Sequence, residues 1–168
     1  MRTLGILGGL SWRSTVFYYN GINQAVEAAS GPMHSARLAM WSFDLQSFFH
    51  EREDWQSNPR QLVDAAKRLE SIGSDGLLIA ANSAHIHAEA IEASVNVPVL
   101  HIGDAVGKAA RKIMLRRIGL IGVPITMTET FYVDRIASHG VEVIVPEQDC
   151  QLDWGELIYG ELFAGEIS

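Results

Sequence analysis

Cysteine, long apolar runs and basic patches are all scarce in this sequence. With one cysteine, Cys150, among 168 residues, no disulfide can form within the chain, which is typical of a reducing compartment. No apolar run approaches the roughly 18 residues that a membrane-spanning helix needs, and the short apolar start indicates a strand, not a signal peptide. Thirteen basic residues stand against 20 acidic ones and form no stripe. We therefore expect a cytoplasmic protein with no membrane or nucleic-acid partner.

Two common kinds of binding site also lack their sequence signals. No His, Cys and carboxylate residues recur at metal-ligand spacing, so we expect no metal centre. The first glycine turn has the pattern G-x-x-G-G, which differs from the G-x-G-x-x-G of dinucleotide-binding proteins. No suitably placed acidic residue ends the second predicted strand either, so the case for nucleotide binding is weak.

What the sequence does contain is a sixfold alternation of short apolar runs with segments of helical periodicity. The apolar runs predict strands at residues 3–7, 37–42, 77–80, 97–102, 118–122 and 141–145. Helices are predicted after residues 11–14, over 61–72, from about 85 to 93, over 105–114 with Asp104 as the cap, from 126 or 128, and over 151–163. This alternation is typical of an α/β fold, a parallel sheet sandwiched by helices.

The stretch from Gly76 to His87 carries the strongest functional signal. An apolar strand is followed by Ala81, Asn82 and Ser83, and ligands of open α/β sheets bind at the carboxyl ends of strands. An amide, a hydroxyl and the N–H groups at a helix entry suit an anion such as a carboxylate. The alternative is that Asn82 and Ser83 only cap the next helix.

Two further places are candidates for ligand contact. Gly8 and Gly9 form either a plain strand-to-helix turn or a turn that lets the backbone approach a small ligand closely. Residues 44–59 form a polar and aromatic loop, a length that favours a lid or binding loop. Arg52 in that loop either meets a substrate carboxylate or is a solvated surface charge.

Seven short motifs occur in order along the chain. They are G-I-L-G-G-L-S-W-R-S-T (5–15), H-S-A (34–36), A-A-K-R-L (65–69), A-N-S-A-H (81–85), H-I-G-D-A (101–105), T-M-T-E-T-F-Y (126–132) and I-Y-G-E-L-F-A-G (158–165). Together they resemble the aspartate/glutamate racemase family over nearly the whole chain. The resemblance implies an isomerase that needs no cofactor, binds a small amino acid or dicarboxylate and forms a homodimer.

The resemblance also implies roles for individual residues. In the family, two thiols on opposite sides of the α-carbon remove and return the α-proton. The family's α-carboxylate site matches Asn82 and Ser83, and a substrate-binding threonine matches Thr126. His85 matches a family histidine that either tunes the charge of the site or packs the helix. The ligand-facing first turn corresponds to Gly8, Gly9, Leu10 and Ser11.

This sequence departs from the family at the groups that move the proton. Ala81 stands where the family has its first catalytic cysteine or, in one subgroup, threonine, and a methyl group cannot act as a base. The second catalytic cysteine of the family lies beyond the position of Ser168, and Cys150 is not in its motif. The resemblance therefore implies a first α/β domain over residues 1–102 and the first part of a similar domain over 103–168. The segments T-L-G-I-L-G-G and R-I-G-L-I-G-V are also similar to each other, either because the two domains repeat one unit or by chance.

Three functions remain open from the sequence. The first is an aspartate/glutamate-type racemase whose activity is impaired at Ala81. The second is a non-catalytic binder of small dicarboxylates or amino acids. The third is one-sided protonation or decarboxylation, if a longer chain keeps a single thiol.

Overall fold

The computed structural model describes residues 2–50, 56 and 58–162. By its internal contacts the chain divides into two compact units, Met1–Leu100 and His101–Ser168. Each unit has its own sheet and its own cluster of buried apolar side chains.

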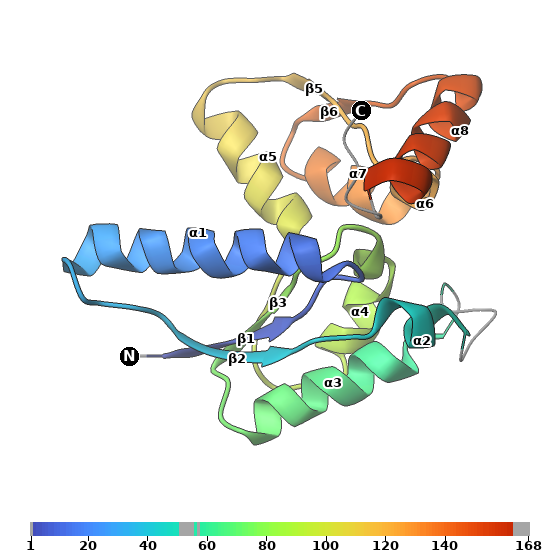
Figure 1. Ribbon diagram of the computed structural model, residues 1–168. Helices are drawn as coiled ribbons and strands as arrows, with labels where there is room; N and C mark the ends of the chain where they lie inside the picture. Colours follow the sequence, from blue (N-terminus) through green and yellow to red (C-terminus); the bar gives the residue numbers. More distant parts are fainter. Residues whose placement is uncertain (1, 51–55, 57, 163–168) are drawn as a thin grey trace. The chain divides into compact units, whose positions relative to one another are not determined.

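The first unit is built on a four-stranded parallel sheet with the strand order β2-β1-β3-β4 (Figure 1). Its strands are β1 (Thr3–Leu7), β2 (Arg37–Trp41), β3 (Gly76–Ile79) and β4 (Val99–Leu100). The central strands β1 and β3 consist largely of apolar residues whose side chains are buried, as expected for strands covered on both faces. Their carboxyl ends lie side by side, because Leu7 pairs with Ile79 in the parallel register.

Helices cover both faces of this sheet. The long helix α1 (Trp12–Ser30) lies on one side, and α3 (Arg60–Ser71) packs against β1, β2 and β3 on the other (Figure 1). Leu62, Ala65 and Leu69 of α3 recur at helical spacing and are buried in the core with Leu77. The other helical segments of this unit are α2 (Leu45–His50), the 3-10 helix η1 (Ser83–His87) and α4 (Ala88–Glu92).

The second unit contains a two-stranded parallel sheet of β5 (Arg117–Gly119) and β6 (Glu142–Ile144). Its helices are α5 (Ile102–Lys112), α6 (Pro124–Thr128), α7 (Thr130–Ala137), α8 (Gln148–Leu157) and the π-helical turn η2 (Ile158–Leu162). The helices α5 and α7 pack against each other, and α7 contacts β6. Ala110, Tyr132, Ile136 and Val141 form the buried cluster.

The predicted α/β class is confirmed, and all six predicted strands are present and parallel. The predicted strand at 97–102 is too long, because the chain turns at His101 and α5 begins at Ile102. Asp104 is not the cap of that helix: it lies in the first turn, and the side chain of His101 caps it. The helix expected from Thr126 or Thr128 is two helices, since the extended backbone of Glu129 separates α6 from α7.

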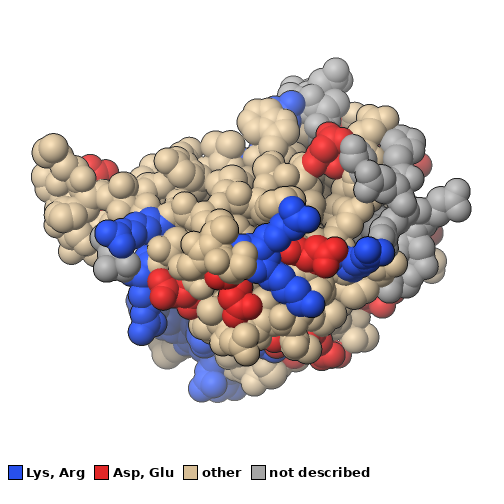
Figure 2. Space-filling view, turned by 90° about the horizontal axis from the view of Figure 1, so that it is seen from below, with Lys and Arg blue, Asp and Glu red and all other residues tan. Residues whose placement is uncertain are grey.

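The surface agrees with the balance of charges in the sequence. On the face that Figure 2 shows, Lys and Arg side chains lie among Asp and Glu side chains instead of gathering into a stripe. Within the described ranges, none of the helices combines the length and apolar character needed to cross a membrane.

Candidate functional site

The turn after β1 and the tip of β3 meet at the carboxyl edge of the first sheet. The backbone N–H of Ala80 donates to the carbonyl of Leu7 over 2.8 Å. The Ser14 hydroxyl lies 2.8 Å from the Ser11 carbonyl and 3.1 Å from the Ala80 carbonyl, so it joins the two loops. The structure thus brings together two of the predicted site segments, Gly8–Ser11 and Ala81–Ser83.

Gly9 allows this close approach. A Cβ atom on Gly9 would lie 2.6 Å from the Ala80 oxygen and 2.9 Å from the Ser11 oxygen, closer than real contacts allow. Its N–H donates to Thr15 Oγ1 over 2.8 Å, and the preceding N–H of Gly8 donates to the Trp41 carbonyl over 2.8 Å. The turn is therefore held by the side chain of Thr15 and the backbone of Trp41, and Gly8, Gly9 and Leu10 are buried.

Ala81, Asn82 and Ser83 follow directly at the end of β3. The Ala81 methyl is half-buried against the core, Ser83 is half-buried and Asn82 is exposed. Asn82 occupies the N-cap position of η1, but its side chain makes no capping hydrogen bond. No hydrogen bond within the described residues engages the side chain of Asn82 or Ser83. Capping alone therefore does not account for these two polar side chains.

The buried side chain of His85 forms a hydrogen bond with the same segment. Its side chain is 1% exposed, and Nδ1 lies 2.8 Å from the carbonyl oxygen of Ala81. Because a carbonyl only accepts, Nδ1 carries the proton in this hydrogen bond. The histidine thus contacts the backbone of Ala81, and it is also part of the packing.

Two further predicted site residues, Thr126 and Arg52, come from other segments of the chain. Thr126 belongs to the second unit, in α6 after the carboxyl end of β5. Its side chain is 1% exposed, and its buried hydroxyl has no hydrogen-bond partner among the described residues. Arg52 falls outside the described residues.

Residue 81 at the tip of β3 carries no group that could move a proton. Ala81 has no titratable group, and Cys150 is an exposed residue of α8 in the second unit. In the part of the chain that the structure describes, no three His, Cys, Asp or Glu side chains cluster as a metal site would require. Asn82 and Ser83 present donor groups of the kind that suit an anion, but position 81 offers no base.

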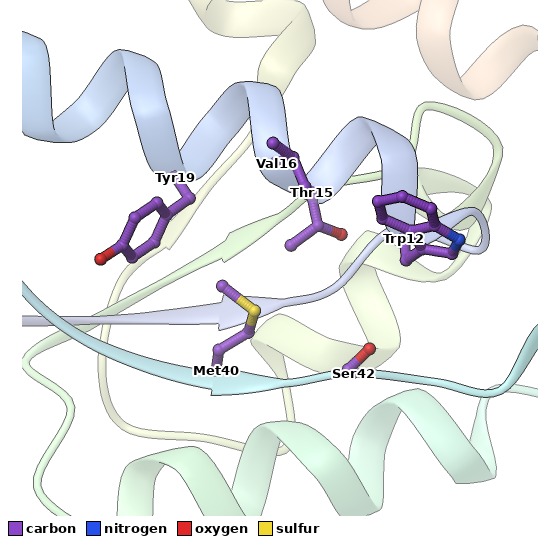
Figure 3. A pocket seen from close by; sticks show the side chains of 6 residues that line it. All are labelled: Trp12, Thr15, Val16, Tyr19, Met40 and Ser42. Carbon is purple, nitrogen blue, oxygen red and sulfur yellow. The ribbon is translucent and has the colours of Figure 1, made fainter.

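Two features of the structure were not predicted from the sequence. An apolar groove of about 200 Å³ lies between α1 and the end of β2, lined by Trp12, Thr15, Val16, Tyr19, Met40 and Ser42 (Figure 3).

In the second unit, Asp104 accepts two hydrogen bonds from Arg135, at 2.8 and 2.7 Å, and one from His139 at 2.8 Å. Arg135 and His139 hold the pKa of Asp104 well below its usual range. Contacts between residues 31 and 35 positions apart leave no local signal in the sequence.

Known proteins resemble this chain in sequence and in structure. Residues 7–166 match the family described as Asp/Glu/Hydantoin racemase. A putative Asp/Glu racemase from Yersinia pestis superposes with a TM-score of 0.88 at 37% identity, over all of this chain and 74% of that one. An aspartate racemase homologue from Pyrococcus horikoshii gives a TM-score of 0.83 at 31% identity, over 99% of this chain and 74% of that one.

A curated relative is more distant. The broad specificity amino-acid racemase RacX from Bacillus subtilis is 24% identical over 144 residues, which is 84% of this chain. The chain spans only 63% of the length of that relative.

Proposed function

The chain belongs to the Asp/Glu/hydantoin racemase family, and from that premise we propose that it is an amino-acid racemase of the aspartate/glutamate type whose proton transfer is impaired at Ala81. In this proposal the α-carboxylate of a small amino acid binds at the tip of β3, and no cofactor takes part. One observation carries the proposal: directly beside Ala81, the side chain of Asn82 is exposed and bonds to no other side chain or backbone group among the described residues.

A racemase must bind the carboxylate of its substrate and must also remove the α-proton. Asn82 donates its amide N–H groups and Ser83 its hydroxyl to a carboxylate, which fixes the amino acid and favours negative charge developing beside the α-carbon. Removal of the weakly acidic α-proton needs a base within hydrogen-bond reach. A methyl group at residue 81 cannot supply that base, so binding is expected to survive while exchange of the proton is slow. Thr126, in the second unit, is proposed as a further substrate-binding residue because its hydroxyl has no partner among the described residues.

The relatives support an amino acid as the ligand. One is named as an aspartate racemase homologue and another as a broad specificity amino-acid racemase. Aspartate and glutamate are therefore the first ligands to test. Their common feature is the α-carboxylate that Asn82 and Ser83 would bind.

The alternative function is a binder without catalysis, and the absence of a base at Ala81 favours it. Isothermal titration calorimetry with aspartate, glutamate and succinate measures binding, and NMR of L- and D-aspartate in D₂O measures deuterium uptake at the α-carbon. We expect heat of binding and a raised melting temperature, since a bound ligand stabilises the folded state by mass action. Exchange above that of an Asn82→Ala variant indicates an impaired racemase, and equal exchange indicates the binder. The proposal fails if no ligand binds at millimolar concentration, or if exchange equals that of a relative with cysteine at this position.

Assembly and location complete the proposal. We infer a cytoplasmic homodimer from the family and from the single cysteine, which suits a reducing compartment. Sedimentation equilibrium of the full chain tests the dimer: a mass of 18.5 kDa that does not change with concentration indicates a monomer instead.

A further inference from the structure

Two successive peptide groups, one on each side of Ala81, are held by buried or half-buried side chains. The carbonyl of Ala80 lies 3.1 Å from the Ser14 hydroxyl, and the carbonyl of Ala81 lies 2.8 Å from His85 Nδ1. Because a trans peptide group is planar, fixing the direction of its carbonyl also fixes the opposite direction of the N–H that follows. Ser14 therefore sets the direction of the Ala81 N–H, and His85 sets that of the Asn82 N–H.

The position of Ser14 is itself tightly determined. Its hydroxyl has one proton and faces two carbonyl acceptors, Ser11 at 2.8 Å and Ala80 at 3.1 Å, so that the proton is shared between them. The space for this arrangement exists because Gly9 has no side chain: its Cβ would collide with Ser14 Oγ. The opposite side of the tip is fixed by β1, since the Ala80 N–H donates to Leu7. Capping of its own helix does not require a serine to form a hydrogen bond with a residue 66 positions away.

The position of His85 is determined by burial. With 1% of its surface exposed, the ring has little freedom to turn away from the Ala81 carbonyl. The two N–H groups that these side chains orient, those of Ala81 and Asn82, take part in none of the hydrogen bonds that the structure shows among the described residues. Two consecutive donors in fixed directions are the kind of backbone feature that binds an anion.

We propose that Ser14 and His85 are positioning residues, which together fix the peptide groups around Ala81 so that the N–H groups of Ala81 and Asn82 face the ligand carboxylate. This inference rests on the proposed function, because it presumes that a carboxylate binds at the tip of β3. It adds two residues that act through the backbone and do not touch the ligand. Loss of either hydrogen bond frees one peptide group to turn and weakens carboxylate binding.

The test uses the full chain with paired variants. Ser14→Ala and His85→Leu remove the donors, while Ser14→Thr and His85→Asn keep a donor near the same place. Ser94→Ala is the matched control, because the Ser94 hydroxyl is also part-buried and donates to a carbonyl three residues earlier, that of Ile91 at 2.8 Å, but reaches no second loop. The dissociation constants for L-aspartate and L-glutamate are measured by calorimetry. The backbone amide signals of Ala81 and Asn82 are followed by NMR in the ligand-free protein.

We expect Ser14→Ala and His85→Leu each to raise the dissociation constant about tenfold, as loss of one hydrogen bond does. Ser14→Thr, His85→Asn and Ser94→Ala should stay within about threefold of the unaltered chain. The amide of Ala81 should shift in Ser14→Ala and that of Asn82 in His85→Leu, a pattern that a general loss of stability does not produce. If the unaltered chain binds its ligand and the dissociation constants of Ser14→Ala and His85→Leu match that of Ser94→Ala, the positioning role is wrong. If the unaltered chain binds neither amino acid, the proposed function itself is wrong.

Discussion

In the function proposed above, the methyl group of Ala81 at the tip of β3 stands where catalysis needs a base, while Asn82 and Ser83 keep the groups that bind a carboxylate. Ala81 is half-buried between two peptide groups that its neighbours hold, so a slightly larger side chain at this position would point in a defined direction. A thiolate is a far better base at neutral pH than an alcohol, because the pKa of an ordinary cysteine is about 8.5. This difference gives a direct test of what residue 81 does.

We predict that Ala81→Cys accelerates deuterium uptake at the α-carbon of aspartate or glutamate by at least about 100-fold over the unaltered chain, the usual scale for a positioned general base. Ala81→Ser has nearly the same volume but no accessible charged form, so its exchange should remain near the starting rate. The measurement is NMR of the substrate α-proton in D₂O at several pH values. The rate of the cysteine variant should rise with pH as the thiol ionises. Equal rates in the two variants would show that residue 81 does not face the α-carbon.

The glycine turn makes a second prediction at the scale of one residue. Gly9→Ala should lower the free energy of unfolding by about 1–3 kcal/mol, the usual cost of overpacking, because its Cβ would lie 2.6 Å from the Ala80 oxygen. Gly21→Ala is the control: no atom lies within 4 Å of its Cβ, and alanine in the middle of α1 should stabilise the chain by about 0.5–1 kcal/mol. Urea denaturation of both variants measures the difference. A neutral Gly9→Ala variant would mean that the two loops lie farther apart than these distances require.

At the scale of elements, α5 begins with an unusual cap. His101 Nδ1 accepts a hydrogen bond from the Gly103 N–H at 3.0 Å, which requires the neutral ring. Burial, followed by the charge of Arg135, lowers the pKa of His101 below its ordinary value, although Asp104 opposes the shift. The unfolded chain therefore takes up a proton at this residue at a higher pH than the folded chain does. The contribution of the neutral His101 ring to the stability of the fold is complete above about pH 6.5 and declines as the pH falls.

We predict that His101→Ala lowers the free energy of unfolding by about 1 kcal/mol at neutral pH, as removal of an N-cap does. His101→Asn keeps an acceptor at the cap and should cost less. Neither variant can protonate residue 101, so both should lose less stability than the unaltered chain between about pH 7 and pH 5. Urea denaturation at the two pH values checks this. A difference between variant and unaltered chain that stays constant over this range would contradict a neutral cap.

The ion pair between α5 and α7 responds at lower pH. The hydrogen bonds from Arg135 are the main cause of the lowered pKa of Asp104. The ionised Asp104 therefore stabilises the fold fully above about pH 4, and this stabilisation is lost as the pH falls further. Asp104→Asn should cost about 1–2 kcal/mol at pH 7, a modest value because the Arg135 side chain is 38% exposed. The cost should shrink when unfolding is measured near pH 3. Asp134→Asn, at an exposed position of α7 next to Arg135, serves as the control and should change little at either pH.

These elements show how far sequence patterns reach. The strands at 3–7 and 77–80 were predictable because buried parallel strands are almost continuously apolar. The end of the strand at Leu100 was not, because the apolar residue Ile102 begins a helix and histidine is not a common cap. The same limit applies to the candidate site. Asn82 and Ser83 lie next to their strand in sequence, whereas the bond from Ser14 to Ala80 joins residues 66 positions apart.

At the scale of the whole molecule, the two units differ in how much apolar surface they bury. The cluster of the first unit joins residues of β1, β3, α3, η1 and α4, among them Leu7, Leu69 and Ile79. The cluster of the second unit is smaller and centres on Tyr132 and Ile136. Burial of apolar surface is the main term that resists unfolding. We therefore expect the predicted domains, residues 1–102 and 103–168, to open as separate cooperative units, with the second opening first.

Native-state hydrogen exchange at rising denaturant concentration measures the opening free energy of each amide. Amides of β1 and β3 should converge on a higher value than those of α5 and α7. Ile79→Val and Ile136→Val form a matched pair, since both isoleucines are buried to within 1% and the change removes one methylene at a cost of about 0.5–1.5 kcal/mol. Each should lower the opening free energy only in its own unit, because a local opening does not involve the core of the other. If both variants lower all protected amides equally, the chain unfolds as one cooperative unit and the division into two domains is wrong.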